Sequence, residues 1–162
     1  MEYISTRNSK IFFSFKDVFL KGLAPDGGLF VPKEIPRFTS EEIKNIKKLS
    51  YRELALKIIL KFSNDEFSEI EMKEIINNSY KNFRVQDIVK IKKLGEINFL
   101  ELFHGPTLAF KDIAMQVIGN MYEKILKKNN LKINIVVATS GDTGAAAIST
   151  IKDRNNMKIF VL

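Results

Sequence analysis

Residues 133–162 hold the pattern that most restricts how this chain can fold. Two apolar runs, Ile133–Thr139 and Met157–Leu162, are separated by a tight loop at 140–144 and a helical stretch at 145–151. Strands without polar alternation are typical of a parallel sheet, and a helix between two of them makes a β–α–β unit. The sequence therefore predicts an α/β fold with an open parallel sheet.

The loop at 140–144 directly follows the first of these strands. Parallel sheets place ligand sites beyond the carboxyl ends of their strands, where backbone N–H groups and the positive end of the next helix attract an anion. A carboxylate or a phosphate suits such a loop. A plain strand-to-helix turn explains the same residues equally well, so the loop alone leaves both interpretations open.

A second stretch, Glu101–Asp112, combines the end of an apolar strand, a Gly-Pro turn and a lysine at the start of a helix that reaches about Lys128. The positive end of the helix dipole and the neighbouring Phe110 are both expected to disfavour the ammonium form of Lys111. An uncharged amine attacks carbonyl groups, and pyridoxal phosphate is the commonest aldehyde cofactor that lysines bind. Most lysines near helix starts are only solvated, and this remains the alternative.

The first half of the chain predicts a small, mainly helical unit with a few short strands. Four helix starts carry capping boxes, in which a Ser or Thr and an acidic residue three positions later cap each other. These pairs are Ser14 with Asp17, Thr39 with Glu42, Ser50 with Glu53 and Ser68 with Glu71. A β-hairpin at 89–94 and 97–102 then leads to His104, whose place beside a Gly-Pro turn favours a structural role.

The composition narrows the chemistry further. The 162 residues include no cysteine and one histidine, which excludes disulfides and thiolate catalysis and argues against a metal site. The sequence has no long apolar run and no secretory signal pattern, so we expect a cytoplasmic protein that does not enter a membrane. The net charge of +7 comes from dispersed basic pairs without a nucleic-acid-binding module, which indicates a solvated surface and no nucleic-acid partner.

Three segments stand in the order and spacing of a known family. They are GLAPDGGLFVP (Gly22–Pro32), HGPTLAFKD (His104–Asp112) and ATSGDTG (Ala138–Gly144). Together they resemble threonine synthase, a pyridoxal-phosphate enzyme of the fold-type II group. The resemblance covers essentially the whole chain, but only the amino-terminal part of these longer enzymes.

The resemblance implies a threonine-synthase-like amino-terminal domain at 1–85 and an incomplete cofactor-binding domain at 86–162. The family's loop for the cofactor phosphate and its partner for the pyridine nitrogen would both lie further along the chain. This piece alone is therefore expected to be a poor catalyst.

The resemblance also implies a reaction, the conversion of O-phospho-L-homoserine and water into L-threonine and phosphate. Lys111 would hold pyridoxal phosphate as an aldimine and then move protons on the substrate. The substrate carboxylate would be bound by Thr139, Ser140 and Thr143, with the N–H groups of Gly141 and Gly144. Asp142 would lie near the cofactor. Because a carboxylate accepts hydrogen bonds, whether it faces the cofactor's 3′-oxygen, a water or a backbone N–H stays open.

Two other classes of function fit parts of the pattern. One is another fold-type II lyase, such as threonine dehydratase or a diaminopropionate-type lyase, although such an enzyme has no need of the segment at Gly22–Pro32. The other is a non-enzymatic module that binds an anion in the 140–144 loop, with Lys111 as a plain charge. Binding of the coloured cofactor separates enzyme from module, and the residues leave the oligomeric state open.

Overall fold

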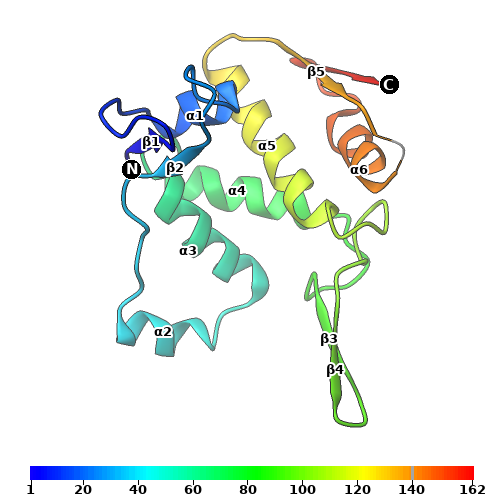
Figure 1. Cartoon of the computed structure of the whole chain (residues 1–162). Helices are drawn as coiled ribbons and strands as arrows, with labels where there is room; N and C mark the ends of the chain where they lie inside the picture. Colours follow the sequence, from blue (N-terminus) through cyan, green and yellow to red (C-terminus); the bar gives the residue numbers. More distant parts are fainter. Residues whose placement is uncertain (140) are drawn as a thin grey trace. The chain divides into compact units, whose positions relative to one another are not determined.

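The computed structural model describes residues 1–139 and 141–162, which form two compact units, Met1–Glu74 and Ile75–Leu162 (Figure 1). The helices are α1 (Phe15–Lys21), α2 (Ser40–Ile46), α3 (Tyr51–Ser63), α4 (Glu69–Tyr80), α5 (Asp112–Lys128) and α6 (Asp142–Ile151). The strands are β1 (Tyr3–Ser5), β2 (Phe30–Pro32), β3 (Lys90–Leu94), β4 (Ile97–Glu101), β5 (Ile133–Val137) and β6 (Met157–Val161). The predicted α/β class is confirmed, and the boundary between the two units falls inside α4.

The capping boxes predicted from the sequence begin the helices of the first unit. Ser14, Thr39 and Ser50 each accept a hydrogen bond from the backbone N–H three residues later, and the acidic side chain at that later position accepts one from the backbone N–H of the cap residue. Ser68 and Glu71 make the same exchange at the start of α4. Each box satisfies two N–H groups that the helix itself leaves without partners.

These caps also lower the pKa of their carboxyl groups. The backbone N–H of Thr39 has the largest effect on Glu42, and the side chain of Ser50 has the largest effect on Glu53. Since the pKa is lowered in the folded state, the charged form stabilises the fold above the ordinary Glu value of 4.5. That contribution is lost as the pH falls below this value.

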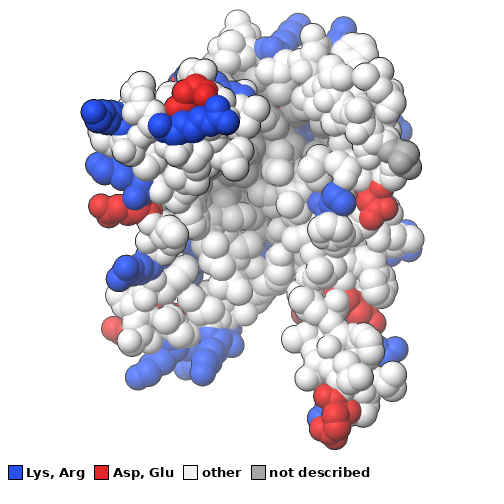
Figure 2. All heavy atoms as spheres, viewed as in Figure 1, with Lys and Arg blue, Asp and Glu red and all other residues white. Residues whose placement is uncertain are grey.

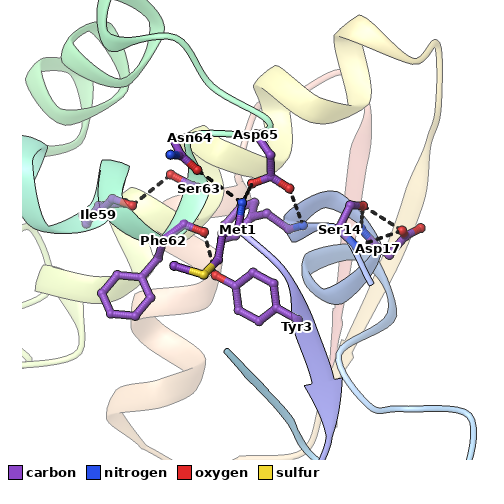
Figure 3. A network of polar contacts seen from close by, with 10 residues as sticks. Met1, Tyr3, Ser14, Asp17, Ile59, Phe62, Ser63, Asn64 and Asp65 are labelled. Carbon is purple, nitrogen blue, oxygen red and sulfur yellow. Dashed lines mark hydrogen bonds and ion pairs between the residues drawn. The ribbon is translucent and has the colours of Figure 1, made fainter. Parts of the chain in front are cut away.

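A buried tyrosine ties β1 to the end of α3 within the first unit (Figure 3). The Tyr3 hydroxyl donates to the carbonyl of Phe62 at 2.6 Å, and burial, with the nearby Asp65 charge, raises the pKa of Tyr3 to about 12. Asp65 also accepts a hydrogen bond from the backbone N–H of Phe15 at 3.0 Å, at the start of α1. The strand and the two helices are therefore joined by two hydrogen bonds, of which the Tyr3 bond is partly buried and the Asp65 bond is exposed.

The Pro25–Gly28 turn precedes β2, which pairs antiparallel with β1. Asp26 Oδ1 accepts from the Ser5 hydroxyl at 2.7 Å and from the Gly28 N–H at 2.9 Å. A Cβ atom at Gly28 would lie 2.2 Å from Ser5 Oγ, so the turn requires glycine there. This close contact explains why the second residue after Asp26 is a glycine.

The second unit contains the predicted β–α–β arrangement. β5 and β6 pair in parallel, with Ile133 opposite Met157 and Val136 opposite Phe160. The apolar composition of β5 and β6 does not mean that both strands are buried throughout: Val136 is 64% exposed and Phe160 52% exposed. Among the described residues no further layer shields these two side chains, whereas a parallel sheet in a complete fold is covered on both faces.

The path of the chain determines which ends of these elements meet. The chain reverses its direction between α5 and β5 and again between β5 and α6. As a result, α6 runs in the same direction as α5 (Figure 1). Side-chain contacts agree with this direction. Gln116 donates to Thr150 Oγ1 at 3.0 Å, and further along both segments Glu123 pairs with Arg154. The amino-terminal ends of α5 and α6 and the carboxyl end of β5 therefore lie at one end of the unit.

Close packing holds α5 against α6. A Cβ atom at Gly119 of α5 would lie 2.0 Å from Thr150 Cγ2 of α6, so the Thr150 methyl group packs directly on the backbone of α5. The buried residues of α5 include Val117, Met121 and Ile125. Two helices fixed in this way give a rigid base for the loops that precede them.

The surface carries mixed charges. On the face drawn in Figure 2, Lys and Arg side chains are dispersed among acidic and uncharged ones.

The predicted hairpin is present as β3 and β4, and its apolar residues Ile91, Leu94, Ile97 and Leu100 are exposed. In the part of the chain that the structure describes, no helix is long and apolar enough to cross a membrane.

Replacing the α3 cap tests the contribution of the capping boxes. Ser50→Ala removes the hydroxyl that caps the Glu53 N–H, and we expect the free energy of unfolding to fall by about 1 kcal/mol. Urea unfolding of the whole chain followed by circular dichroism measures this loss. Ser9→Ala, an exposed serine outside any helix, serves as the control and should leave the midpoint unchanged. Equal midpoints for both variants would contradict the role of the cap.

Candidate active site

The loop from Gly105 to Lys111 consists of tight turns that lead into α5. The Leu108 N–H donates to the Gly105 carbonyl at 3.2 Å, and the Asp112 N–H donates to the Ala109 carbonyl at 3.1 Å. Leu108 adopts a φ of +64°, in the left-handed region that disfavours residues with a side chain. Lys111 is the N-cap residue of α5, so the helix begins at Asp112, one position after the predicted start. The lysine thus stands on a short, constrained loop against a packed helix.

The amine of Lys111 lies over the ring of Phe110. Its Nζ is 4.4 Å from the ring centroid, and among the described residues it makes no hydrogen bond or ion pair. Phe110 was expected to be an apolar neighbour that disfavours a cation, and this expectation is wrong, because the face of its ring attracts one. The amine nevertheless has no carboxylate partner there that would compete with a bound ligand.

The second predicted site segment lies between β5 and α6. Ser140 lies outside the described residues, and the other five predicted positions can be located. The helix starts at Asp142, three residues earlier than expected, so Asp142, Thr143 and Gly144 form its first turn instead of a loop. An aspartate in a first turn interacts favourably with the helix dipole, which explains the earlier start.

The backbone amides of this segment differ in their availability. The Gly141 N–H donates to Thr139 Oγ1 at 3.4 Å, and the Gly144 N–H donates to the Gly141 carbonyl at 3.0 Å. Both groups had been expected to bind a carboxylate. The N–H groups of Asp142 and Thr143 are the first of the helix and have no acceptor within it. Sequence reasoning missed these two amides because it began the helix too late.

Gly144 has a packing role of its own. A Cβ atom there would lie 2.8 Å from Thr139 Cγ2, so glycine lets the first turn of α6 approach the end of β5. The hydroxyl of Thr139 accepts from Gly141, while its methyl group touches the helix. The two residues therefore shape the segment as a pair.

The Lys111 loop and the 139–144 segment meet at the same end of the second unit. Lys111 precedes α5, and Asp142 begins α6, which runs in the same direction and packs against α5. The carboxyl end of β5 lies at this end too. A primary amine and the positive ends of two helices thus flank the edge of the sheet where α/β proteins bind their ligands.

Two further polar side chains belong to the Lys111 loop. His104 Nε2 lies 3.0 Å from Glu101 Oε2, and this pair gives the histidine a structural partner. Asp112 is fully buried and accepts two hydrogen bonds from Thr107. Sequence reasoning did not single out Asp112, although an acidic residue beside the candidate lysine was a visible signal. Within the described residues, no group of three His, Cys, Asp or Glu side chains could hold a metal ion.

Comparisons with known proteins identify this arrangement. Residues 2–80 match the family described as Threonine synthase N terminus. The whole chain is 43% identical to a threonine synthase from Pseudomonas aeruginosa, and it spans 35% of that protein's length. It is 42% identical to a threonine synthase from Schizosaccharomyces pombe, of which it spans 34%. The solved structure of PLP-bound threonine synthase from Brucella melitensis matches 99% of the chain with a TM-score of 0.94 and 41% identity, over 35% of that structure.

The antiparallel strand pairs, the helices and the parallel β5–β6 pair therefore form an α/β arrangement already seen in solved enzymes. In sequence and in fold, the chain is the counterpart of the amino-terminal portion of the threonine synthases. It spans about a third of the length of these relatives. The resemblance inferred from the three sequence segments is confirmed.

The contact between Gly144 and Thr139 generates a prediction. Gly144→Ala introduces a methyl group 2.8 Å from Thr139 Cγ2 and should destabilise the chain by about 1–3 kcal/mol, as overpacking commonly does. Thr139→Ser removes that methyl group but keeps the hydroxyl. The double variant should therefore recover most of the lost stability in a double-mutant cycle of chemical unfolding. Simple additivity of the two changes would show that the residues do not interact.

Proposed function

We propose that this chain is the amino-terminal part of an enzyme that converts O-phospho-L-homoserine and water into L-threonine and phosphate, with pyridoxal phosphate attached to Lys111. The observation that carries the proposal is the Lys111 amine, which stands at the start of α5 beside the carboxyl end of the parallel sheet. The relatives named above are threonine synthases, and one is described as PLP-bound.

The residues of the site fit this cofactor at its aldehyde end. Lys111 offers a primary amine without a hydrogen-bonded or ion-paired partner among the described residues, as attachment to an aldehyde requires. When bound, pyridoxal phosphate supplies an electron sink that stabilises a carbanion next to the substrate nitrogen. The groups that hold its phosphate and its pyridine nitrogen are proposed to lie in the part of the full enzyme that corresponds to the remaining length of the relatives.

Lys111 has a second proposed task. Once its amine is free of the cofactor, it moves protons between the substrate carbons. The packed α5 helix keeps the backbone of Lys111 fixed while the long side chain swings, so one amine can reach several neighbouring carbon atoms.

The segment from Thr139 to Gly144 is proposed to bind the substrate carboxylate. The hydroxyls of Thr139, Ser140 and Thr143 are suitable donors. The N–H groups of Gly141 and Gly144, which were expected to join them, would first have to leave Thr139 Oγ1 and the Gly141 carbonyl. The amides of Asp142 and Thr143 extend this set, since they begin α6 and have no acceptor within the helix. Asp142 itself is exposed, and its carboxylate is assigned to the neighbourhood of the cofactor.

The proposal divides the chain into parts of two domains. Residues 1–85 would form the amino-terminal domain and residues 86–162 a part of the cofactor-binding domain. The family match at residues 2–80 supports this division, while the two compact units divide earlier, at Glu74. The match over the amino-terminal region also favours threonine synthase over other fold-type II lyases and over a non-enzymatic anion-binding module.

Replacement of Lys111 tests the attachment of the cofactor. In the full-length enzyme, Lys111→Ala should abolish the borohydride-reducible linkage to pyridoxal phosphate, because no other residue would supply the amine. Peptide mass spectrometry after reduction locates the linkage. Lys132→Ala, which removes an exposed lysine near β5, is the control and should keep the label. A label of equal extent on a different lysine in both proteins would refute the assignment.

Replacement of Thr143 tests the carboxylate site. Thr143→Val removes one hydrogen bond to a charged group and should raise the KM for O-phospho-L-homoserine by roughly ten- to a hundredfold. Thr143→Ser keeps the hydroxyl and should behave like the parent enzyme. The affinity for pyridoxal phosphate, measured by absorbance titration, should stay the same in both variants. A loss of cofactor affinity with an unchanged KM would mean that this segment binds the cofactor instead.

A further inference from the structure

The carboxylate of Asp112 is the most deeply buried charged group beside the candidate lysine. Asp112 is the first residue of α5 and directly follows Lys111, and its side chain has no exposed surface. Carboxylates are seldom buried completely unless hydrogen bonds replace the lost water. The surroundings of this side chain therefore carry information about what it does.

Both oxygens of this carboxylate bind a single residue of the preceding loop. The Thr107 N–H donates to Oδ2 at 2.8 Å, and the Thr107 hydroxyl donates to Oδ1 at 2.8 Å. The two bonds close a ring of main chain and side chain from Thr107 to Asp112, and Lys111 lies inside that ring. The backbone of Lys111 cannot shift far unless one of these bonds breaks or lengthens.

The backbone at Gly105 also packs against the Asp112 side chain. A Cβ atom at Gly105 would lie 2.4 Å from Asp112 Cβ and 2.5 Å from Oδ2, so the chain at Gly105 packs directly on the side chain. Leu108, within the ring, adopts the unfavourable φ of +64°. A loop that contains such a residue needs compensating bonds to stay in one conformation.

We propose that Asp112 is a positioning residue, whose buried carboxylate fixes the loop from Gly105 to Lys111 and thereby fixes the point from which the Lys111 amine is presented. The inference rests on the proposed function of Lys111. Asp112 acts through the backbone and touches neither substrate nor cofactor. Effective covalent attachment depends on orientation, and a shift of about 1 Å in a reacting group can cost on the order of a hundredfold in rate.

The two hydrogen bonds from Thr107 to Asp112 are called the clamp below. Four variants of the whole chain test these two bonds separately. Asp112→Ala removes both acceptors, and Thr107→Val removes only the hydroxyl donor. Asp112→Asn keeps an acceptor for the Thr107 N–H and offers its amide to the Thr107 hydroxyl, so it should restore the ring without the charge. Thr107→Ser keeps both donors. The two disruptive changes and the two conservative ones form matched pairs.

The first readout is hydrogen exchange of the Thr107 amide, which needs no cofactor. Asp112→Ala should speed this exchange by about ten- to a hundredfold, since a buried bond to a charged acceptor is lost. Asp112→Asn and Thr107→Ser should stay close to the parent chain. Unchanged exchange in Asp112→Ala would overturn the clamp whatever the chain does with pyridoxal phosphate.

The second readout is the ratio of label on Lys111 to label on Lys132 after addition of pyridoxal phosphate and borohydride reduction. We expect Asp112→Ala and Thr107→Val to lower this ratio about tenfold or more, and the conservative variants to preserve it. If the parent chain shows no preference for Lys111, the proposed function fails, while the exchange experiment still decides the role of Asp112. If Asp112→Ala does not fold, Thr107→Val decides the labelling readout, because it removes the hydroxyl bond to Asp112 Oδ1 and keeps the amide bond to Oδ2.

A control for general stability completes the test. Ser79→Ala removes hydrogen bonds from the buried Ser79 hydroxyl to the carbonyls of Ile75 and Gln116, in the same unit but away from the loop. It should lower the unfolding midpoint and leave the labelling ratio unchanged. A ratio that falls as far in Ser79→Ala as in Asp112→Ala would show that Asp112 acts only through stability, and the positioning role would be overturned.

Discussion

The contact between α5 and α6 is the constraint on which the arrangement of the second unit depends. Gly119 leaves room for the methyl group of Thr150, and Gln116 adds a hydrogen bond to the same threonine. Because the two helices are in direct contact and run in the same direction, the segments that precede them are held at one end of the sheet. A lysine before one helix and a threonine- and glycine-containing segment before the other therefore lie at the same end of the unit.

The Lys111 loop shows how a short segment can be both strained and fixed. Leu108 occupies an unfavourable backbone region, and two bonds from Thr107 to the buried Asp112 hold the chain there. Part of the favourable free energy of folding offsets the strain of this conformation, as is common at functional sites. The helix behind it provides the stiffness, because its inner face is packed against apolar neighbours.

Local signals allowed much of this fold to be predicted from the sequence. The capping boxes depend on residues three positions apart, so their prediction needs no knowledge of distant contacts. The site was harder to predict. Whether Phe110 faces the lysine amine, whether Gly144 touches Thr139, and whether Asp112 is buried all depend on side chains and segments that meet only in the folded chain. The exposed face at Val136 and Phe160 likewise depends on what else covers the sheet, which strand composition cannot reveal.

The fit between Gly119 and Thr150 also limits how this part of the chain can diverge during evolution. A side chain at position 119 would occupy the space of the threonine methyl group, so a larger residue there is tolerated only if position 150 becomes smaller or the helices separate. Separation would move the start of α6 relative to Lys111 and disturb the distance between the two loops. A constraint on the spacing of the two loops therefore falls on Gly119, within α5, and on Thr150, near the carboxyl end of α6.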